Sequence, residues 1–329
     1  MRISKKSSTF AVAKVFERAF EMKIALTTEL PAEGFKRLKG HDLYAQPEEA
    51  EILVSTFDYE VPREMIEAMP HLKLIANFGA GFNNIDLETC RERGIRVTNT
   101  PQPVIDPTAE LAFALMIDIA RRVSEFDRSV RSGQATFGVM RNLSHSLYGK
   151  TLGILGMGRI GQALARRAIA SGMRIIYHNR KPINSDALKA LNGGNDTMVR
   201  YVDFQTLLQD SDYLSLNLPY TPEVHHIIGK PELGMMKRSA YLINTARGAH
   251  IDEEALVEAL KSRIIAGAAL DVYEFEPQIS KELLTLPNVV LSPHTGTGTW
   301  EGRIAMCENV TENILAFTEE RTDDMNIVI

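Results

Sequence analysis

The stretch that decides the fold begins with an apolar run and ends in a glycine-rich turn, Lys150-Thr-Leu-Gly-Ile-Leu-Gly156-Met-Gly158-Arg-Ile-Gly161. An amphipathic segment continues from this turn to Ser171. A buried strand, a tight turn and a helix in this order form the unit that holds a dinucleotide in Rossmann-type domains. Gly156 permits the turn, Gly158 lets the backbone approach a pyrophosphate, and Gly161 lets the helix pack closely on the strand. The stretch therefore predicts a parallel α/β domain that binds a dinucleotide.

The start of this helix is expected to contact the phosphates. Its first N–H groups have no partner inside the helix, and the helix dipole is positive at that end. Met157, Arg159 and Ile160, which lie between and after the glycines, are therefore predicted cofactor-binding residues together with the glycines themselves. Glycines also serve ordinary turns, but the strand and the helix on either side of this group favour the nucleotide.

The strand predicted at residues 174–178 decides which dinucleotide is expected. An acidic residue at its end would accept hydrogen bonds from the adenosine ribose of NAD(H). This chain instead has Asn179, followed by Arg180 and Lys181. Two cations without an acid favour the 2′-phosphate of NADP(H), which Arg180 can bind with two parallel hydrogen bonds. NAD(H) stays open as the alternative, because a solvated basic loop is also common.

Composition limits the class of protein. The chain has 329 residues, of which 44% are apolar and 24% charged, and its formal net charge is −5. One core stops growing at about 250–300 residues, so two domains are expected. The negative charge gives no reason to expect a nucleic-acid partner, and no apolar run reaches the roughly 20 residues of a membrane helix. Cys90 and Cys307 lie far apart without zinc or C-x-x-C spacing, so we expect a reduced, cytoplasmic setting.

Beyond Met22, short apolar runs alternate with amphipathic segments, which is the pattern of a parallel sheet covered by helices on both faces. A first series of strands is predicted at residues 24–27, 51–55, 72–78 and 95–99, with helices at 62–69 and 86–93. A second series of strands is predicted at residues 151–156, 174–178, 213–218, 240–244, 266–272 and 289–292. Two α/β domains with Rossmann-like or flavodoxin-like parallel sheets are therefore expected, with an active-site cleft between them.

The two series also set the predicted domain boundaries. Residues 22–102 together with 302–329 are expected to form a substrate-binding, catalytic domain, and residues 103–301 a dinucleotide-binding domain. Residues 1–21 are interpreted as an N-terminal extension outside the fold, because charged residues such as Lys14 interrupt any secretory core. An amphipathic transit segment is the alternative for this extension.

Three segments near the ends of later predicted strands each carry one chemically distinctive residue: Arg247, Glu276 and His294. Open α/β sheets bind ligands at the carboxyl ends of their strands. Taken singly, these residues have ordinary explanations as a surface ion pair, a solvated acid and a histidine with satisfied hydrogen bonds. Their shared position at strand ends predicts that together they form a catalytic set.

From Met22 onward the chain resembles the D-isomer-specific 2-hydroxyacid dehydrogenase family, and within it the glyoxylate/hydroxypyruvate reductases. The resembling motifs are the glycine turn, residues 79–86 (Gly-Ala-Gly-Phe-Asn-Asn-Ile-Asp), residues 218–223 (Leu-Pro-Tyr-Thr-Pro-Glu) and the three catalytic segments in family order. The resemblance implies an NAD(P)-dependent oxidoreductase that reduces a small 2-keto acid to the D-2-hydroxy acid. Residues 295–300 (Thr-Gly-Thr-Gly-Thr-Trp) depart from the Gly-Ser-Ala-Thr that relatives often carry, so the size of the substrate stays open.

The roles that the resemblance implies agree with the chemistry of the three residues. Arg247 would bind the substrate carboxylate and polarise the adjacent keto oxygen. His294 would give a proton to that oxygen as hydride reaches the keto carbon. Glu276 would orient His294 and favour the protonated ring.

The resemblance also assigns binding roles to loop residues. Ala80 and Gly81 would bind the substrate carboxylate through backbone N–H groups, with a plain turn as the alternative. Asp271 would contact the nicotinamide carboxamide, with a buried capping acid as the alternative. The other cofactor contacts that the resemblance implies are those of Pro219, Thr221, Ala246 and His294.

Two further functions stay open on the sequence. A dinucleotide-sensing corepressor or scaffold can keep the same fold and triad, and a reductase of a larger acid such as 2-ketogluconate would use the same chemistry. We expect no metal, because His225 and His226 lack the spacing of a ligand set and adjacent side chains rarely point to one centre. A helix is predicted at residues 107–122, and its part around residues 108–122 together with the segment 137–148 resembles the family's dimer arm, so a homodimer is expected.

Overall fold

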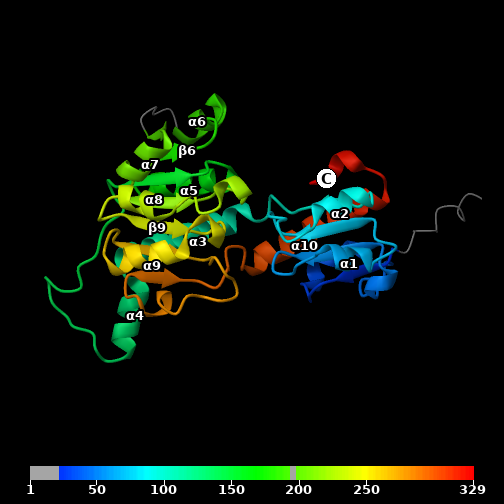
Figure 1. Cartoon of the computed structure of the whole chain (residues 1–329), viewed down its shortest axis with the longest axis horizontal. Coiled ribbons are helices and arrows are strands. Elements are labelled where there is room, and N and C mark those ends of the chain that lie inside the picture. Colours follow the sequence, from blue (N-terminus) through cyan, green and yellow to red (C-terminus); the bar gives the residue numbers. More distant parts are fainter. Residues whose placement is uncertain (1–21, 193–197) are drawn as a thin grey trace, which may run out of the picture. The chain divides into compact units, whose positions relative to one another are not determined.

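The computed structural model describes residues 22–192 and 198–329, so the predicted N-terminal extension lies outside the described residues. The described residues fall into two units, each built around a parallel sheet (Figure 1). One unit contains the described residues up to Val104 together with Trp300–Ile329, and the other contains Ile105–Thr299. The two series of apolar runs predicted two α/β domains with parallel sheets, and the structure confirms this prediction.

The first unit has a four-stranded sheet in the order β1-β2-β3-β4. Its strands are β1 (Ile24–Leu26), β2 (Ile52–Thr56), β3 (Leu74–Phe78) and β4 (Arg96–Thr98). Its helices are α1 (Arg63–Glu67), α2 (Leu87–Glu92) and α10 (Trp300–Thr318), with 3-10 turns η1 (Ala32–Leu38), η2 (Pro47–Glu49) and η6 (Thr322–Asp324). Paired residues form one apolar row across the sheet: Ala25, Leu53, Ile75 and Val97. This register brings the end of β3, and the glycine-containing loop after it, to the carboxyl edge of the sheet.

The second unit has a seven-stranded sheet in the order β11-β10-β9-β8-β5-β6-β7. Its strands are β5 (Thr151–Leu155), β6 (Arg174–His178), β7 (Val199–Tyr201), β8 (Tyr213–Leu216), β9 (Tyr241–Asn244), β10 (Gly267–Leu270) and β11 (Val289–Leu291). The chain order reverses at β5, which has β6 on one side and β8 on the other. Doubly wound sheets bind their ligands at such a switch point, outside the carboxyl ends of the strands.

Helices cover both faces of this sheet (Figure 1). They are α3 (Ile105–Arg121), α4 (Val123–Arg131), α5 (Arg159–Ala170), α6 (Ser185–Asn192), α7 (Phe204–Asp210), α8 (Lys230–Met235) and α9 (Glu253–Lys261), with 3-10 turns η3 (Pro222–Val224), η4 (Gly248–His250) and η5 (Leu283–Thr285). Successive strand residues alternate between the two cores: Leu242 packs in one and Ile243 in the other. None of the described helices combines the length and the apolarity needed to cross a membrane.

The predicted element boundaries differ from the structure in two informative places. β7 was not predicted, since only the first of its residues, Val199, is buried and the strand lies at the sheet edge. The helix predicted at 107–122 begins at Ile105 and ends before Arg122, whose backbone is left-handed with φ +57°. A second helix, α4, then starts at Val123.

Candidate active site

The glycine turn after β5 is shaped by two close backbone approaches. Gly156 has φ +98°, and a Cβ atom on it would lie 2.7 Å from backbone atoms of Asn217 and Leu218. A Cβ atom on Gly161 would lie 2.4 Å from the carbonyl oxygen of Gly156. A side chain at either position would push the turn off its neighbours. The protein's own packing therefore explains these two glycines.

Packing does not explain Gly158. Its backbone (φ −77°, ψ −161°) suits any residue, and a Cβ atom on it would meet no atom within 4 Å. Gly158 is also the N-cap of α5, which has no side-chain cap; Arg159 and Ile160 follow as the first residues of the helix, and Met157 precedes it in the turn. The open space and the N-terminal N–H groups make a cradle that fits a phosphate group and that a methyl group would fill.

Asn179 follows β6 and turns its side chain toward this glycine turn. Its Oδ1 accepts a hydrogen bond from the Met157 N–H at 2.7 Å, and its carbonyl accepts one from the Tyr201 hydroxyl at 3.2 Å. Arg180 and Lys181 come next, and both are exposed. The end of β6 thus presents an amide and two accessible cations where a nucleotide-binding acid would otherwise stand.

Arg247, Glu276 and His294 lie in the loops after β9, β10 and β11. These three strands are neighbours and run parallel, so their carboxyl ends meet at one edge of the sheet. The structure therefore brings together the three residues that the sequence predicted as a catalytic set.

His294 and Glu276 form a hydrogen-bonded pair. His294 Nδ1 lies 2.6 Å from Glu276 Oε2, while Glu276 Oε1 accepts a hydrogen bond from the Tyr273 N–H at 2.8 Å. Burial by itself would raise the pKa of the Glu276 carboxyl. The pKa nevertheless lies below its usual range, because the carboxylate is stabilised by the hydrogen bond and charge of His294, by the Tyr273 N–H and by the charge of Arg247. The side chains of His294 and Glu276 keep 27% and 33% of their surface exposed, so a ligand can reach the pair.

Arg247 is half-buried at the start of η4. Its Nη1 donates to the Ala246 carbonyl at 2.7 Å. Burial lowers the pKa of Arg247, and the charge of Glu276 partly offsets this effect. A partly desolvated guanidinium beside a histidine–carboxylate pair is suited to bind a carboxylate, because the attraction is screened less than in water.

Two residues that the sequence analysis did not single out fix the position of Arg247. The buried Asn244 side chain donates to the Arg247 carbonyl at 2.9 Å and accepts from the Ala246 N–H at 3.0 Å. A Cβ atom on Gly248 would lie 1.9 Å from the Tyr273 carbonyl, so only glycine lets this turn approach the segment that leads to Glu276. The glycine directly after Arg247 was the signal available in the sequence.

Asp271 has the contacts of a buried capping acid. Its carboxylate accepts hydrogen bonds from the N–H groups of Thr295 and Gly296, both at 2.8 Å, and its carbonyl accepts the His294 N–H at 2.8 Å. These bonds hold the loop in which His294 has a left-handed backbone, with φ +52°. The nicotinamide contact suggested for Asp271 stays a prediction, as do the cofactor contacts of Pro219, Thr221 and Ala246.

The loop of Ala80 and Gly81 in the first unit is held by two asparagines that the sequence analysis passed over. Asn99 donates to the Ala80 carbonyl at 2.8 Å, and the buried Asn77 donates to the Gly81 carbonyl at 2.7 Å. The N–H groups of Ala80 and Gly81 make no hydrogen bond to another described residue. With the carbonyls engaged, these N–H groups are the donors that the loop can offer to an anion.

Comparison with known proteins gives a consistent result. Residues 113–296 match the family model described as the NAD-binding domain of D-isomer-specific 2-hydroxyacid dehydrogenases. A glyoxylate reductase of Thermococcus litoralis is 44% identical over 319 residues, which span 90% of this chain and 94% of that protein. A glyoxylate reductase of Korarchaeum cryptofilum is 42% identical over 313 residues, with 90% of this chain and 92% of that protein covered.

Solved structures agree with the sequence relatives. The crystal structure of a glyoxylate reductase from Paecilomyes thermophila matches with a TM-score of 0.81 at 36% identity, covering 92% of this chain and 96% of that one. An NADPH-dependent glyoxylate/hydroxypyruvate reductase of Sinorhizobium meliloti, solved with NADP and malonate, matches with a TM-score of 0.80 at 29% identity, covering 90% and 93%.

Proposed function

Because the chain belongs to the D-isomer-specific 2-hydroxyacid dehydrogenase family, whose members are nicotinamide-dependent oxidoreductases, we propose that it reduces a small 2-keto acid of the glyoxylate or hydroxypyruvate type to the D-2-hydroxy acid. NADPH is the preferred reductant in this proposal, and NADH the alternative. The observation that carries the proposal is the His294–Glu276 pair beside Arg247 at one edge of the sheet. The relatives that are glyoxylate reductases support the substrate class.

In the proposed reaction, Arg247 binds and orients the substrate. Its planar guanidinium forms two hydrogen bonds to the carboxylate and draws electron density from the adjacent keto oxygen. The N–H groups of Ala80 and Gly81 stay predicted carboxylate donors from the sequence alone. The hydroxy-acid product keeps this carboxylate, so these contacts set affinity and orientation more than the rate of the chemical step.

His294 supplies the proton. With Nδ1–H donating to Glu276, Nε2 is the nitrogen that delivers a proton to the keto oxygen. Reduced nicotinamide, when bound, would supply the hydride for the keto carbon, and the proton from His294 completes the hydroxyl group. Glu276 keeps the ring oriented through the hydrogen bond to Nδ1.

The preference for NADPH rests on the end of β6. Asn179 places no negative charge beside the adenosine ribose, and Arg180 and Lys181 are accessible to a 2′-phosphate. The related reductase solved with NADP supports this choice. The cradle at Gly158 fits the pyrophosphate of either dinucleotide.

Initial rates of NADPH and NADH oxidation against a panel of 2-keto acids test the proposal. We expect NADPH-dependent turnover of glyoxylate or hydroxypyruvate that is lost in Arg247→Ala and His294→Ala, while cofactor binding persists in both. Turnover confined to larger acids such as 2-ketogluconate would show that the chain is a reductase of larger 2-keto acids instead. Tight NADPH binding with no oxidation in a single turnover by any acid would overturn the reductase and favour the sensing corepressor.

We also propose that the chain forms a homodimer through residues 137–148. This segment exposes large apolar side chains in series, with Phe137 88% and Val139 95% exposed. Such a concentration of apolar surface is typical of an interface. Light scattering should give twice the chain mass, and the change Val139→Asp should shift it toward the monomer; a wild-type monomer at micromolar concentration would overturn the proposal.

A further inference from the structure

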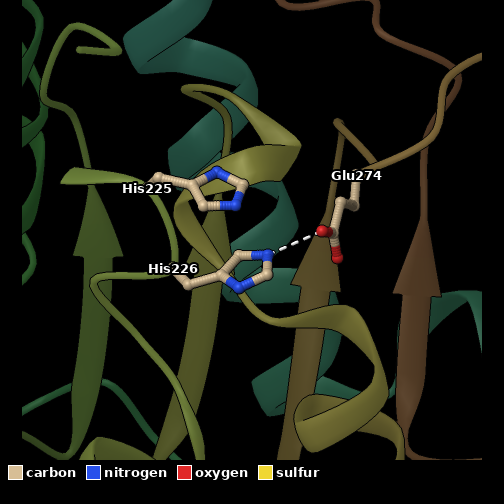
Figure 2. A group of neighbouring side chains, drawn as sticks. All are labelled: His225, His226 and Glu274. Atoms are coloured by element: carbon tan, nitrogen blue, oxygen red, sulfur yellow. Dashed lines mark hydrogen bonds and ion pairs between the residues drawn. The ribbon is translucent and has the colours of Figure 1, made fainter. Parts of the chain in front are cut away.

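A cluster of two histidines and one glutamate lies outside the proposed catalytic set. His226 Nε2 is 2.6 Å from Glu274 Oε1, and the rings of His225 and His226 stack with centroids 3.9 Å apart and planes 21° apart. One ligand atom from each of the three side chains lies within 4.8 Å of the others, a grouping found nowhere else among residues 22–192 and 198–329. Figure 2 shows both imidazoles beside the carboxylate, which reaches them from the loop after β10.

Backbone geometry brings the two adjacent histidines to the same side. Successive side chains of an extended segment point to opposite faces, so neighbouring histidines are expected to diverge. His226 instead has a left-handed backbone with φ +51°, which cancels the alternation. A non-glycine residue in this conformation costs about 1 kcal/mol or more and persists where the surroundings hold it. Here a hydrogen bond from the His226 N–H to the Ala249 carbonyl at 2.9 Å holds it.

The outer partners orient the cluster as they do in metal sites. The Tyr220 hydroxyl lies 3.3 Å from His225 Nδ1, which leaves Nε2 of that ring as the ligand nitrogen. Glu274 Oε2 accepts the Glu253 N–H at 3.0 Å, and the Glu253 carboxylate accepts the Glu274 N–H at 3.1 Å. Glu274 is therefore fixed through both its side chain and its backbone, while Oε1 faces the imidazoles.

We propose that His225, His226 and Glu274 bind one divalent transition metal ion of the class of Zn²⁺, Co²⁺ or Ni²⁺. Two imidazoles and a carboxylate are ligands that these ions share, and three protein ligands leave a coordination position for water. Bonds of about 2.0–2.2 Å to a tetrahedral ion separate the ligand atoms by about 3.3–3.6 Å. The metal takes the place of the proton between His226 and Glu274, and the exposed His225 ring turns out of its stack so that its Nε2 points at the ion.

The simpler explanation, a hydrogen-bonded His226–Glu274 pair, accounts for only part of this geometry. That pair needs neither a second imidazole nitrogen within 4.8 Å nor the Tyr220 hydroxyl beside His225 Nδ1. The side chain of His226 is 36% exposed and that of Glu274 11%, so the pair is accessible to an ion from solvent. None of the three residues belongs to the proposed catalytic set, so metal binding and the proposed activity can be tested separately.

Titration of the untagged full-length chain with Co²⁺ alone tests the proposal through the visible absorption of a low-symmetry site, with calorimetric titration of Zn²⁺ alongside. We expect one Co²⁺ per chain, displaced by Zn²⁺. The substitutions His225→Gln and Glu274→Gln should each weaken Co²⁺ binding about tenfold or more. Two control variants, His71→Gln on the surface of the first unit and His294→Gln at the catalytic pair, should bind Co²⁺ as the wild type does.

His225→Gln changes an exposed side chain, so this variant tests the ligand set even if Glu274→Gln does not fold. Thermal unfolding identifies which variants are folded. A wild-type chain that binds no Co²⁺ or Zn²⁺ at micromolar concentration would overturn the proposal, and so would an affinity that His225→Gln leaves unchanged. Loss of binding in His294→Gln alone would assign the metal to the catalytic pair instead.

Discussion

Replacing Gly158 by alanine should separate nucleotide binding from folding. The backbone at this position suits alanine, and the added methyl group meets no protein atom within 4 Å. Alanine reduces the freedom of the unfolded chain, so the free energy of unfolding should stay constant or rise by about 0.4–1 kcal/mol. The methyl group instead enters the cradle in front of the N-terminus of α5, where the pyrophosphate must approach.

The change Gly158→Ala should weaken NADPH binding. A hydrogen bond between a backbone N–H and a charged phosphate contributes about 1.5–3 kcal/mol, so losing one should raise the NADPH dissociation constant about 10–150-fold. The dissociation constant can be measured from NADPH fluorescence, and stability from thermal unfolding of the same preparation. The expected result is a chain at least as stable as the wild type that binds NADPH poorly.

Two matched glycine-to-alanine variants serve as controls. Gly234, in α8, also has open space around its Cβ position but lies outside the turn, so Gly234→Ala should bind NADPH normally. Gly161→Ala places a methyl group 2.4 Å from the Gly156 carbonyl and should lower stability by about 1–3 kcal/mol. If Gly158→Ala binds NADPH as tightly as Gly234→Ala does, the cradle is not the phosphate site and the reasoning fails.

Three further predictions concern the cofactor, the catalytic pair and stability. The double change Asn179→Asp with Arg180→Ser should lower the ratio of kcat/KM for NADPH over NADH about tenfold to a hundredfold, because a charge-assisted bond to the 2′-phosphate is lost; an unchanged ratio would place the ribose elsewhere. Glu276→Gln should lower kcat about 10²–10⁴-fold without changing NADPH affinity, and a normal kcat would exclude the carboxylate from the reaction. Burial lowers the pKa of His250 from 6.5 to about 4. Because the pKa of His250 is lower in the folded chain than in the unfolded one, the free energy of unfolding falls by about 3 kcal/mol in total as the pH drops from 6.5 through 4. His250→Val should show a smaller loss than the wild type in denaturant titrations at pH 7 and 5. An equal loss in both chains would exclude His250 as its source.

The elements around the glycine turn were predictable because several signals coincide there. The strand at 174–178 has the predicted bounds, and β5 ends one residue before the predicted end. These strands are buried and apolar throughout their middle residues, and glycine marks the start of the helix that follows β5. β7 gives no such signal: it is short, lies at the edge of the sheet and exposes Arg200 and Tyr201.

The meeting of Arg247, Glu276 and His294 at one edge of the sheet was predictable, but the residues that support them were not. Arg247, Glu276 and His294 are polar residues that follow apolar strands, and the order of β9, β10 and β11 then brings them to one edge. Support from Asn244 and Gly248 depends on which backbone atoms approach within hydrogen-bonding or van der Waals distance. Such distances follow from the tertiary packing of loops, which no local pattern of residues determines.

The expectation that His225 and His226 point apart assumed a regular extended backbone. One left-handed residue invalidates that assumption, and histidine is among the side chains that adopt this conformation more often than most. The same conformation occurs at His294, so two histidines of this chain with left-handed backbones each bond a glutamate of the segment 274–276 at 2.6 Å. The two pairs differ in their third partner. Arg247 beside the His294–Glu276 pair favours an anionic ligand, whereas a second imidazole with a lone pair beside the His226–Glu274 pair favours a cation. Two histidine–glutamate pairs with the same 2.6 Å contact therefore favour ligands of opposite charge, because the neighbouring residue is a cation in one case and a second imidazole in the other.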